Sequence, residues 1–498
     1  MDTGILAYGA YLPKARLQRA EIAAAHAWVA PGLKGLAKGE RTHANWDEDA
    51  VTMAVEAARD ALAGDEGAGI AGVYMASTSF PFADRQNAGI VADALALPRG
   101  LLTLDLGSSQ RAGTSALGVA LKAAAGTDGP VIVVGSEKCT TKPASTLEMT
   151  RGDGAAALIV GRGDDVIARL IGQHTEAVDF VDHFRESGAE FDYTWEERWV
   201  RDEGYLSIAP EAIRSALARF EVAADSVARF IFPVAARRVA GQIAKAAGIP
   251  EAAVADNLQA TVGECGAAHP LLMLAGALQE ASPGERIVVA GFGQGCDVLI
   301  FEVTGAITRL APRAGLSGAL ARRRAETRYT RYLAFNNLMK MELGIRAEVD
   351  KPTGLSTLYR NKDMAQAMIG GKCSACGTAQ YPASRVCVNP NCGAVDTQEP
   401  YRFAERPARI NSFTADRLTF TPDPPQYFGM VQFDGGGRLM ADFTDIDPDA
   451  DLQVGQPMKM MFRVKDYDAK RGFRRYFWKA TPDEGADAAV RTSPAKGD

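Results

Sequence analysis

The sequence predicts a layered α/β domain built from two similar halves, followed by a small metal-binding module and a β-rich domain. Short runs rich in valine and isoleucine alternate with alanine-rich helical stretches over residues 1–304, as in sheets that helices cover. The same order of elements recurs once within this span. Four cysteines then lie within residues 373–392, ahead of strand-like segments with polar turns.

The first half contains one helix and three strands. Residues 51–64, VTMAVEAARDALAG, repeat apolar positions at helical spacing and are rich in alanine. Apolar runs follow at 70–80, 129–137 and 155–161. Because these runs are short and lie between helical stretches, we expect them to be central strands of a sheet.

The second half has a similar order of elements. Residues 210–220 and 267–281 have helical periodicity, and 227–236 is typical of a strand. Residues 284–303 contain two strands around a glycine-rich turn, similar to 129–137 and the strand after it. An internal duplication explains this repetition, and a conventional doubly wound domain is the alternative.

The remaining segments differ in composition. Residues 305–350 form a connector with seven arginines between Arg309 and Arg331, either a solvated bridging helix or a surface for phosphates or a partner. Beyond Lys372 the sequence is β-rich with polar turns, which favours a small barrel. The tail 482–498 has too few apolar residues to pack, so we expect it to be disordered.

Composition argues against several classes of function. The formal net charge of −6 disfavours a general nucleic-acid-binding protein. No apolar run of 18 residues occurs and the N-terminus does not resemble a signal sequence, so we expect a cytoplasmic protein without a membrane segment. Seven cysteines, four of them clustered, indicate a reducing compartment and one metal site rather than a disulfide scaffold.

The cysteine cluster has the form C-x2-C-x10-C-x4-C. Two cysteine pairs on tight turns can deliver four thiolates to a tetrahedral Zn²⁺, and Gly377 suits such a turn. Four protein ligands complete the shell, so the predicted zinc is structural rather than catalytic. The predicted ligands are Cys373, Cys376, Cys387 and Cys392.

The stretch LLTLDLGSSQRAGTSALGVALKAA, residues 101–124, ends an apolar strand in Gly-Ser-Ser and begins a helix of small residues. This elbow presents one side chain at a helix N-terminus, where the dipole and free N–H groups favour a nucleophilic anion. The residue presented there is Gln110, which is not a nucleophile. Gln110 therefore cannot form a thioester.

The sequence from Gly4 to Val303 resembles the hydroxymethylglutaryl-CoA synthases of the thiolase superfamily, especially archaeal ones, and more distantly ketoacyl synthase III. The resemblance lies in five segments that occur in the expected order: GILAYGAYLPKARL, DEDAVTMAVEAARDAL, QRAGTSAL, TLEMTRGDGAAALIVG and SPGERIVVAGFGQG. Residues 330–480, including LSTLYRNKDMAQAMIGGKC, resemble the zinc-ribbon and OB-fold family that accompanies thiolase-like enzymes.

These resemblances imply an α/β fold class, with a duplicated thiolase-like α/β/α/β/α domain followed by a small zinc ribbon and a β-barrel OB-fold. The implied domains are 1–304 (thiolase-like), 305–350 (connector), 351–400 (helical lead-in and zinc ribbon), 401–481 (OB-fold) and 482–498 (disordered tail).

In the family that the chain resembles, an elbow Cys takes the acyl group from acyl-CoA, and a Glu, a His and an Asn assist. The motif DLGSSQRAGT places Gln110 at the Cys position, and STSFPF places Thr78 at the Glu position. The His position holds Pro233 and the Asn position holds Glu264. All four residues are changed.

Other implied features are retained. The basic position that contacts CoA in relatives is Arg238, with Arg237 beside it. The resemblance further implies a CoA thioester as substrate. It also implies a homodimer, since relatives form their active sites at a two-fold interface.

Three interpretations of the site stay open. In the first, the pocket makes or breaks a carbon–carbon bond beside a thioester or β-keto acid carbonyl, without a covalent intermediate. The first interpretation covers retro-aldol, Claisen or retro-Claisen and decarboxylative reactions of β-oxygenated acyl-CoA. Gln110 would donate an N–H to the carbonyl or enolate oxygen, and a desolvated Glu264 would act as general base.

In the second interpretation, Ser109 or Cys265 replaces the missing nucleophile; alternatively, Ser109 caps the helix and Cys265 is a small buried hydrophobe. In the third, the chain is a non-catalytic scaffold that holds a true thiolase or synthase in a complex. His183 and His269 are further imidazole candidates, and Cys296 is either a reactive or a packed thiol.

Overall fold

The computed structural model describes residues 2–127 and 129–485. The chain divides into two compact units. The first contains the residues up to 92 and residues 97–339, and the second contains 93–96 and the residues from 340 on.

The first unit is built on a nine-stranded mixed sheet with the order β11-β12-β13-β8-β1-β7-β6-β4-β5. Its N-terminal half contributes β1 (Thr3–Tyr11), β4 (Gly72–Ala76), β5 (Leu102–Leu106), β6 (Val131–Glu137) and β7 (Gly154–Arg162). Its C-terminal half contributes β8 (Ala168–Ala177), β11 (Val227–Ile231), β12 (Arg286–Phe292) and β13 (Gly295–Val303). Every strand expected from an apolar run in this domain is present.

The two halves share one strand arrangement, which confirms the predicted duplication. From the centre outward, β1, β7, β6 and β4 correspond to β8, β13, β12 and β11. The pairs β6–β7 and β12–β13 are antiparallel, whereas β4–β6 and β11–β12 are parallel. Strands β1 and β8 pair antiparallel and join the halves. A doubly wound domain would have a mostly parallel sheet without this repeat, so that alternative is wrong.

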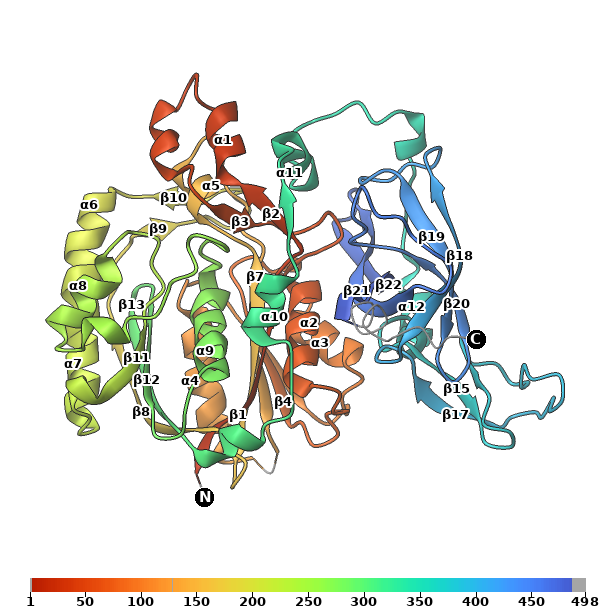
Figure 1. Ribbon diagram of the computed structural model, residues 1–498, viewed down its shortest axis with the longest axis horizontal. Coiled ribbons are helices and arrows are strands. Elements are labelled where there is room, and N and C mark those ends of the chain that lie inside the picture. The colour runs from red at the N-terminus through yellow and green to blue at the C-terminus, as the bar shows by residue number, and fades with distance from the viewer. Residues whose placement is uncertain (1, 128, 486–498) are drawn as a thin grey trace, which may run out of the picture. The chain divides into compact units, whose positions relative to one another are not determined.

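Helices cover the outer faces of both halves of the sheet, and two further helices lie in the layer between the halves. As Figure 1 shows, α4 (Ala112–Ala124) and α9 (His269–Gln279) lie between the two halves. The outer faces are covered by α2 (Ala50–Leu62) and α3 (Asn87–Ala94) on one side, and by α7 (Ala209–Arg219) and α8 (Val239–Ala246) on the other. The unit therefore has the predicted α/β/α/β/α layers.

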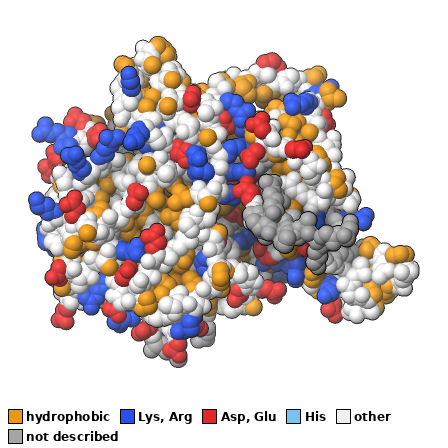
Figure 2. Space-filling model, viewed as in Figure 1, with side chains coloured by type: hydrophobic (Ala, Val, Ile, Leu, Met, Phe, Trp, Pro, Cys, Tyr) orange, Lys and Arg blue, Asp and Glu red, His pale blue; other side chains and the backbone are white. Residues whose placement is uncertain are grey.

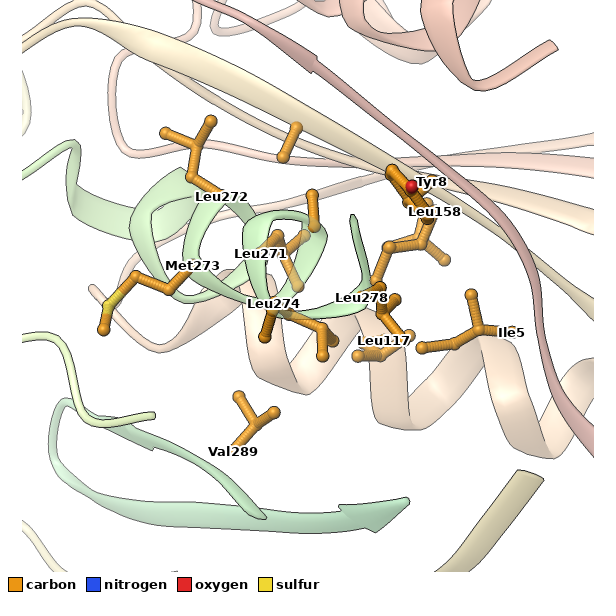
Figure 3. Packing of buried hydrophobic residues seen from close by; sticks show 14 of the residues in the cluster. Ile5, Tyr8, Leu117, Leu158, Leu271, Leu272, Met273, Leu274, Leu278 and Val289 are labelled. Atoms are coloured by element: carbon orange, nitrogen blue, oxygen red, sulfur yellow. The ribbon is translucent and has the colours of Figure 1, made fainter. Parts of the chain in front are cut away.

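The central layer is a continuous hydrophobic core. Helix α9 reads HPLLMLAGALQ and is apolar on nearly all sides, which suits a helix buried between two sheets. Leu271, Leu274 and Leu278 of α9 are buried together with Leu117 of α4 and Val289 of β12 (Figure 3). Burying each leucine stabilises the fold by about 1.5–3 kcal/mol.

The starts of α4 and α9 lie against each other. A short 3₁₀-helix, Gly266–Ala268, precedes α9. A Cβ on Gly113 would lie 2.0 Å from the carbonyl oxygen of Ala267, so only glycine permits this approach. The close contact brings the elbow and the segment before α9 to the same edge of the sheet.

The arginine-rich segment packs onto the first unit. It forms α10 (Gly315–Ala321), β14 (Arg324–Glu326) and α11 (Tyr329–Phe335), and β14 pairs with β2 (Ala15–Gln18). The Arg313 guanidinium donates to the carbonyl oxygens of Tyr8 and Ala61, and Arg323 forms an ion pair with Glu40. The segment is therefore packed against the first unit rather than forming a solvated bridging helix, and the guanidiniums of Arg313 and Arg323 are paired.

The first unit also contains several short helices and strands. They are α1 (Arg19–Ala25), a 3₁₀-helix (Pro31–Leu36), β3 (Glu40–Thr42) and α5 (Thr146–Thr150). Between β8 and α7 lie β9 (His183–Phe184), β10 (Tyr193–Thr194), α6 (Glu197–Trp199) and a π-helical stretch (Val200–Ile208). Strands β9 and β10 form a two-stranded antiparallel sheet. π-Helical geometry is rare and is often found near functional sites.

The second unit contains two sheets after a helical lead-in. The lead-in consists of α12 (Leu355–Arg360) and α13 (Lys362–Ala365). The first sheet contains β15 (Ile369–Cys373), β16 (Ala379–Gln380) and β17 (Gln398–Arg402). The second sheet contains β18 (Ala408–Asp416), β19 (Gln426–Phe433), β20 (Arg438–Asp442), β21 (Pro457–Asp468) and β22 (Phe473–Pro482), in the order β20-β19-β18-β21-β22. The β-rich prediction is thus confirmed. The tail expected at 482–498 lies, from residue 486 on, outside the described residues.

The surface carries charges of both signs. Figure 2 shows basic and acidic side chains interspersed over the face in view. Among the residues that the structure describes, no helix combines the length and the apolar character needed to cross a membrane.

Candidate active site

Gln110 lies at the turn between β5 and α4, and the residues around it fix its position. The hydroxyl of Ser109 donates to the carbonyl oxygen of Gly293 at 3.1 Å and accepts from the backbone N–H of Arg111 at 3.3 Å. Ser109 therefore ties the elbow to the glycine-rich turn between β12 and β13. Ser108 adopts a φ of +69°, in the left-handed region.

The buried carboxylate of Asp297 holds the first turn of α4 in place. Asp297 of β13 forms an ion pair with Arg111 at 3.0 Å. It also accepts hydrogen bonds from the hydroxyls of Thr114, Ser115 and Thr175, at 2.6–3.0 Å. Because each of these partners is fixed by secondary structure, the helix start beside Gln110 is held rigidly.

Gln110 is the end of a hydrogen-bonded chain that continues through His183 to Asp182. The Nδ1 atom of His183 lies 2.9 Å from a carboxylate oxygen of Asp182, and its Nε2 atom lies 3.4 Å from Nε2 of Gln110. A carboxylate oxygen accepts, so Nδ1 carries a hydrogen in this contact, and in the tautomer with that single ring hydrogen Nε2 presents a lone pair. Asp182 is buried, and the His183 side chain is only 16% exposed. The geometry is that of an oriented acid–base imidazole.

On the other side of Gln110, Glu137 ends β6 with its side chain buried. Its carboxylate accepts hydrogen bonds from the hydroxyls of Ser77 and Ser79, at 2.8 and 2.6 Å. It also accepts from the N–H and hydroxyl of Thr78, and from the N–H of Ala267. A carboxylate with five donor groups is held in one orientation. Thr78, which the resemblance places at the family's Glu position, thus contacts a carboxylate that comes from β6.

Gly266 packs closely against both of these side chains. An ideal Cβ on Gly266 would lie 2.7 Å from Oε1 of Gln110 and 2.8 Å from Oε2 of Glu137. Oε1 of Gln110 is buried and accepts no hydrogen bond from the described part of the chain. We call these two oxygens, which face Gly266, the acceptor corner. Its groups can accept hydrogen bonds, but neither oxygen can donate one.

Glu264 is ion-paired rather than isolated. Its carboxylate lies 2.8 Å from the guanidinium of Arg151, and the two side chains are 19% and 9% exposed. Burial lowers the pKa of Arg151, but the adjacent Glu264 charge raises it above its ordinary value. The sequence predicts a desolvated carboxylate at this position, and in the structure the guanidinium of Arg151 compensates its charge.

Several predicted candidates lie in the core. Cys265 and Cys296 are fully buried, and burial raises the pKa of both thiols, so they stay protonated at neutral pH. His269 is also buried; its Nδ1 accepts from the N–H of Cys265, and its Nε2 lies 2.9 Å from the carbonyl oxygen of Asn257. Burial lowers the pKa of His269. Cys265 and His269 pack within the segment before α9 and orient it, whereas Cys296 packs in β13.

Pro233 and the two basic residues lie after β11. Arg237 and Arg238 are exposed, and Arg238 immediately precedes α8 with a φ of +65°. Burial, together with the nearby charges of Arg41 and Arg237, lowers the pKa of Arg19 to about 10. Several cations therefore share this region, which suits a polyanionic group.

In the second unit, the four predicted metal ligands converge. Their Sγ atoms lie within 4.8 Å of one another, with 3.9 Å between Cys373 and Cys392 and 3.6 Å between Cys376 and Cys387. A tetrahedral Zn²⁺ with Zn–S bonds of about 2.3 Å requires S–S distances of about 3.8 Å. The four thiolates therefore fit a closed, structural metal site.

Sequence reasoning identified Gln110 but not the groups that contact it. His183 was one of two unplaced imidazoles, and its neighbour Asp182 and the carboxylate of Glu137 were missed. The Asp-His dipeptide of DFVDHF was a usable signal for the first pair, because adjacent residues can orient one another. No local pattern marks Glu137, since its partners come from two other segments.

Comparisons with known families and proteins match both units. The description "3-Oxoacyl-[acyl-carrier-protein (ACP)] synthase III C terminal" matches residues 217–301. "ChsH2, rubredoxin-like zinc ribbon domain" matches residues 366–396, and "ChsH2, C-terminal OB-fold domain" matches residues 401–463. The zinc-ribbon and OB-fold predictions are thus confirmed.

Curated relatives match the first unit. A hydroxymethylglutaryl-CoA synthase from Aeropyrum pernix is 30% identical over 337 residues, which cover 66% of this chain and 93% of the relative. One from Methanosarcina mazei is 28% identical over 344 residues, covering 67% and 97%.

Solved structures share the fold of the first unit. The crystal structure of an HMG-CoA synthase complexed with CoA aligns with a TM-score of 0.60 at 20% identity, over 70% of this chain and 93% of the other. The 3-oxoacyl-(acyl carrier protein) synthase III of Pseudomonas aeruginosa aligns with a TM-score of 0.55 at 22% identity, over 61% and 98%.

Proposed function

Because this chain belongs to the hydroxymethylglutaryl-CoA synthase family, we propose that it binds a CoA thioester and makes or breaks a carbon–carbon bond beside the thioester carbonyl. The reaction proceeds without an acyl-enzyme at residue 110. The observation that carries this proposal is the series of hydrogen bonds from Asp182 through His183 to Gln110. It places an oriented imidazole beside the amide side chain at the elbow.

His183 is the acid–base group in this proposal. Asp182 fixes the ring so that Nε2 faces Gln110, and Nε2 takes up the proton that the substrate loses and returns it. Such a positioned imidazole typically contributes a factor of about 10²–10⁴ to the rate. The amide nitrogen of Gln110 can donate an N–H to the thioester or enolate oxygen, and its contact with His183 is released when Nε2 of His183 takes up the substrate proton.

The other candidates serve less well. The carboxylate of Glu264 is engaged in an ion pair with Arg151, so we transfer the base role from Glu264 to His183. Cys265 stays a thiol in the core, and the hydroxyl of Ser109 is already bound to Gly293. We therefore favour the first interpretation, in which the reaction proceeds without a nucleophilic side chain and without a covalent intermediate.

For CoA, we propose that Arg237 and Arg238 contact the phosphates. Both side chains are exposed, and they share their region with Arg19. The solved relative with bound CoA supports CoA as the ligand class. The positive potential at this position also favours the approach of a polyanion.

We further propose that the chain forms a homodimer. Strand β5 is an edge strand of the nine-stranded sheet, and Leu102 at its start is 60% exposed. An exposed edge with an apolar side chain readily pairs with a second edge. The scaffold interpretation predicts instead that a thiolase binds this chain. The experiment below tests this by co-purification.

The test is turnover of a panel of acyl-CoA and β-keto acid substrates by the purified protein. We expect turnover that falls by about 10²–10⁴ in His183→Ala. The control His174→Ala, in which an imidazole that contacts Glu176 on β8 is removed, should keep its rate within threefold. Inactivity toward every substrate, with co-purification of a thiolase, would contradict the proposal and favour the scaffold.

A paired test addresses the base. Glu264→Gln leaves the buried Arg151 without its counter-charge, which costs about 3–5 kcal/mol of unfolding free energy. We expect the folded fraction of this variant to keep its kcat within tenfold of the wild type. A loss of kcat as large as that of His183→Ala, in protein shown by circular dichroism to be folded, would return the base role to Glu264.

A further inference from the structure

We infer that Tyr205 is a catalytic residue of the proposed reaction, and that its hydroxyl donates a hydrogen bond to the oxygen on the β-carbon of the acyl group. The inference rests on the proposed function, because it adds a second donor to the same site. Gln110 donates to the thioester or enolate oxygen, and Tyr205 serves the other oxygen of a β-oxygenated substrate. The hydroxyl binds that oxygen by a hydrogen bond only, so no covalent bond to Tyr205 forms.

Two buried aromatic rings fix the ring of Tyr205. Its centroid lies 4.9 Å from that of Phe292 and 6.0 Å from that of Phe232, both in edge-to-face contact. Aromatic pairs prefer this arrangement, so the two rings hold Tyr205 in place. Tyr205 lies in the π-helical stretch before α7. Gly204 lets this stretch pack closely, since a Cβ there would lie 2.7 Å from the ring of Phe180.

Both aromatic partners of Tyr205 belong to segments that form the site. Phe292 directly precedes Gly293, whose carbonyl oxygen accepts a hydrogen bond from the elbow. Phe232 directly precedes Pro233, where the resemblance places the His of the family. A proline side chain can neither donate nor accept a hydrogen bond. The ring of Tyr205 thus packs beside the turn that touches the elbow and beside the position that lacks an imidazole.

Charged side chains of the site act on the Tyr205 hydroxyl. Burial, with the nearby charges of Glu264 and Asp182, raises its pKa, whereas Arg151 lowers it. The hydroxyl is therefore within electrostatic range of both the Asp182–His183 pair and the Glu264–Arg151 ion pair. A phenol whose pKa is raised keeps its hydrogen at neutral pH, so it remains a donor.

The hydroxyl of Tyr205 is open to a ligand. It makes no hydrogen bond within the described part of the chain, and it is not among the enclosed polar atoms there, so it reaches solvent. Tyr205 as a whole is half-buried. The acceptor corner only accepts, and Nε2 of His183 presents a lone pair in the tautomer described above. Tyr205 supplies the donor that these groups lack.

A donor at the β-oxygen suits carbon–carbon chemistry in both directions. When the bond forms, negative charge develops on the oxygen of the β-carbonyl, and when the bond breaks, the same oxygen gives up that charge. A donor that is already in place stabilises the charge without reorganisation. Removal of one such donor typically lowers kcat by about 10²–10³.

Calorimetric titration of the full-length protein tests the inference without turnover. The probes are two thioethers, S-(3-oxobutyl)-CoA, which carries an oxygen on the β-carbon, and S-butyl-CoA, which lacks it. The measured quantity is the ratio of their dissociation constants. We expect the preference for the oxobutyl compound to fall by about three- to tenfold in Tyr205→Phe, because phenylalanine keeps the ring and removes the donor. Tyr193→Phe, which alters an exposed tyrosine of β10, should keep the wild-type ratio.

The outcomes separate the inference from the proposed function. An unchanged ratio in Tyr205→Phe overturns the inference and leaves the proposed function standing. Binding of neither probe by the wild type contradicts both. With a substrate that the wild type turns over, Tyr205→Phe should lower kcat by about 10²–10³ and leave both KM and the thermal unfolding temperature close to their wild-type values. A kcat equal to that of Tyr193→Phe would also overturn the inference.

Discussion

At residue 110, the turn between β5 and α4 presents an amide side chain. A Gln side chain can only bind, through two hydrogens and one oxygen, so every reactive step must fall to its neighbours. Asp182 and His183 form an oriented acid–base pair on one side, and Glu137 supplies a fixed charge on the other. The chemistry of the site therefore depends on the two groups that flank the Gln110 amide, His183 on one side and Glu137 on the other.

Residue-scale burial also predicts how stability depends on pH. Burial, together with the charge of Arg41, lowers the pKa of His43 from 6.5 to about 3. Between these values the unfolded chain binds a proton that the folded chain does not, so the unfolding free energy decreases as the pH falls. From pH 6.5 to 5.0, this group alone removes about 1.5 kcal/mol.

The measurement is urea unfolding at both pH values, in the wild type and in His43→Gln. The variant should lose about 1.5 kcal/mol less than the wild type over this interval. Equal losses in both proteins would mean that His43 is not held neutral by the fold.

The candidate site was only partly predictable at this scale. Gln110 lies in a motif whose flanking residues fix its position, so the sequence located it. Its contact with His183 spans 73 positions, and the donors to Glu137 lie 58–60 and 130 positions away. Contacts between distant segments leave no trace in local spacing, because the fold alone brings these residues together.

At the scale of elements, periodicity and capping determined most helices and strands. The helix expected at 51–64 is α2, which begins after a capping box between Asp49 and Thr52 and ends as Ala63 adopts a left-handed conformation. The arginine-rich segment was interpreted incorrectly, because its guanidiniums bind backbone carbonyls and Glu40 of the first unit. Composition alone cannot distinguish an exposed arginine from one that is already paired.

The close approach of α4 to Ala267 gives an element-scale prediction. Gly113→Ala would place its Cβ 2.0 Å from the carbonyl oxygen of Ala267, so the start of α9 must shift. We expect a loss of about 1–3 kcal/mol of unfolding free energy, with lower turnover because Ala267 also donates to Glu137.

Gly126→Ala is the control, since Gly126 follows the same helix and its Cβ would meet only ordinary contacts. Its unfolding free energy should stay within about 0.5 kcal/mol of the wild type. A Gly113→Ala protein as stable as this control would show that the two helix starts do not touch.

At the scale of the whole molecule, the chain combines two units with separate cores. The duplication was predictable because both halves repeat one order of apolar runs, and the zinc ribbon because four cysteines lie within 20 residues. That the two halves form one continuous nine-stranded sheet was not predictable from the sequence. The halves are joined by the antiparallel pairing of β1 with β8, and no local pattern relates these two strands.

The second unit predicts one bound zinc per chain. Elemental analysis of the purified protein should give about one zinc, and Cys376→Ser should lower this content and destabilise the ribbon, because metal binding contributes directly to folding. Cys296→Ser, which alters a core thiol of the first unit, should keep the full zinc content. Zinc content unchanged in Cys376→Ser would exclude this ligand set.

The central claim is that carbon–carbon chemistry proceeds here without an acyl-enzyme, with His183 moving the proton. Rapid quenching during a single turnover of a cleavable acyl-CoA, followed by intact-mass measurement, tests it most directly. We predict product formation with the protein mass unchanged at every time point. Transient appearance of an acyl adduct on the chain, formed and consumed at the rate of turnover, would contradict the account.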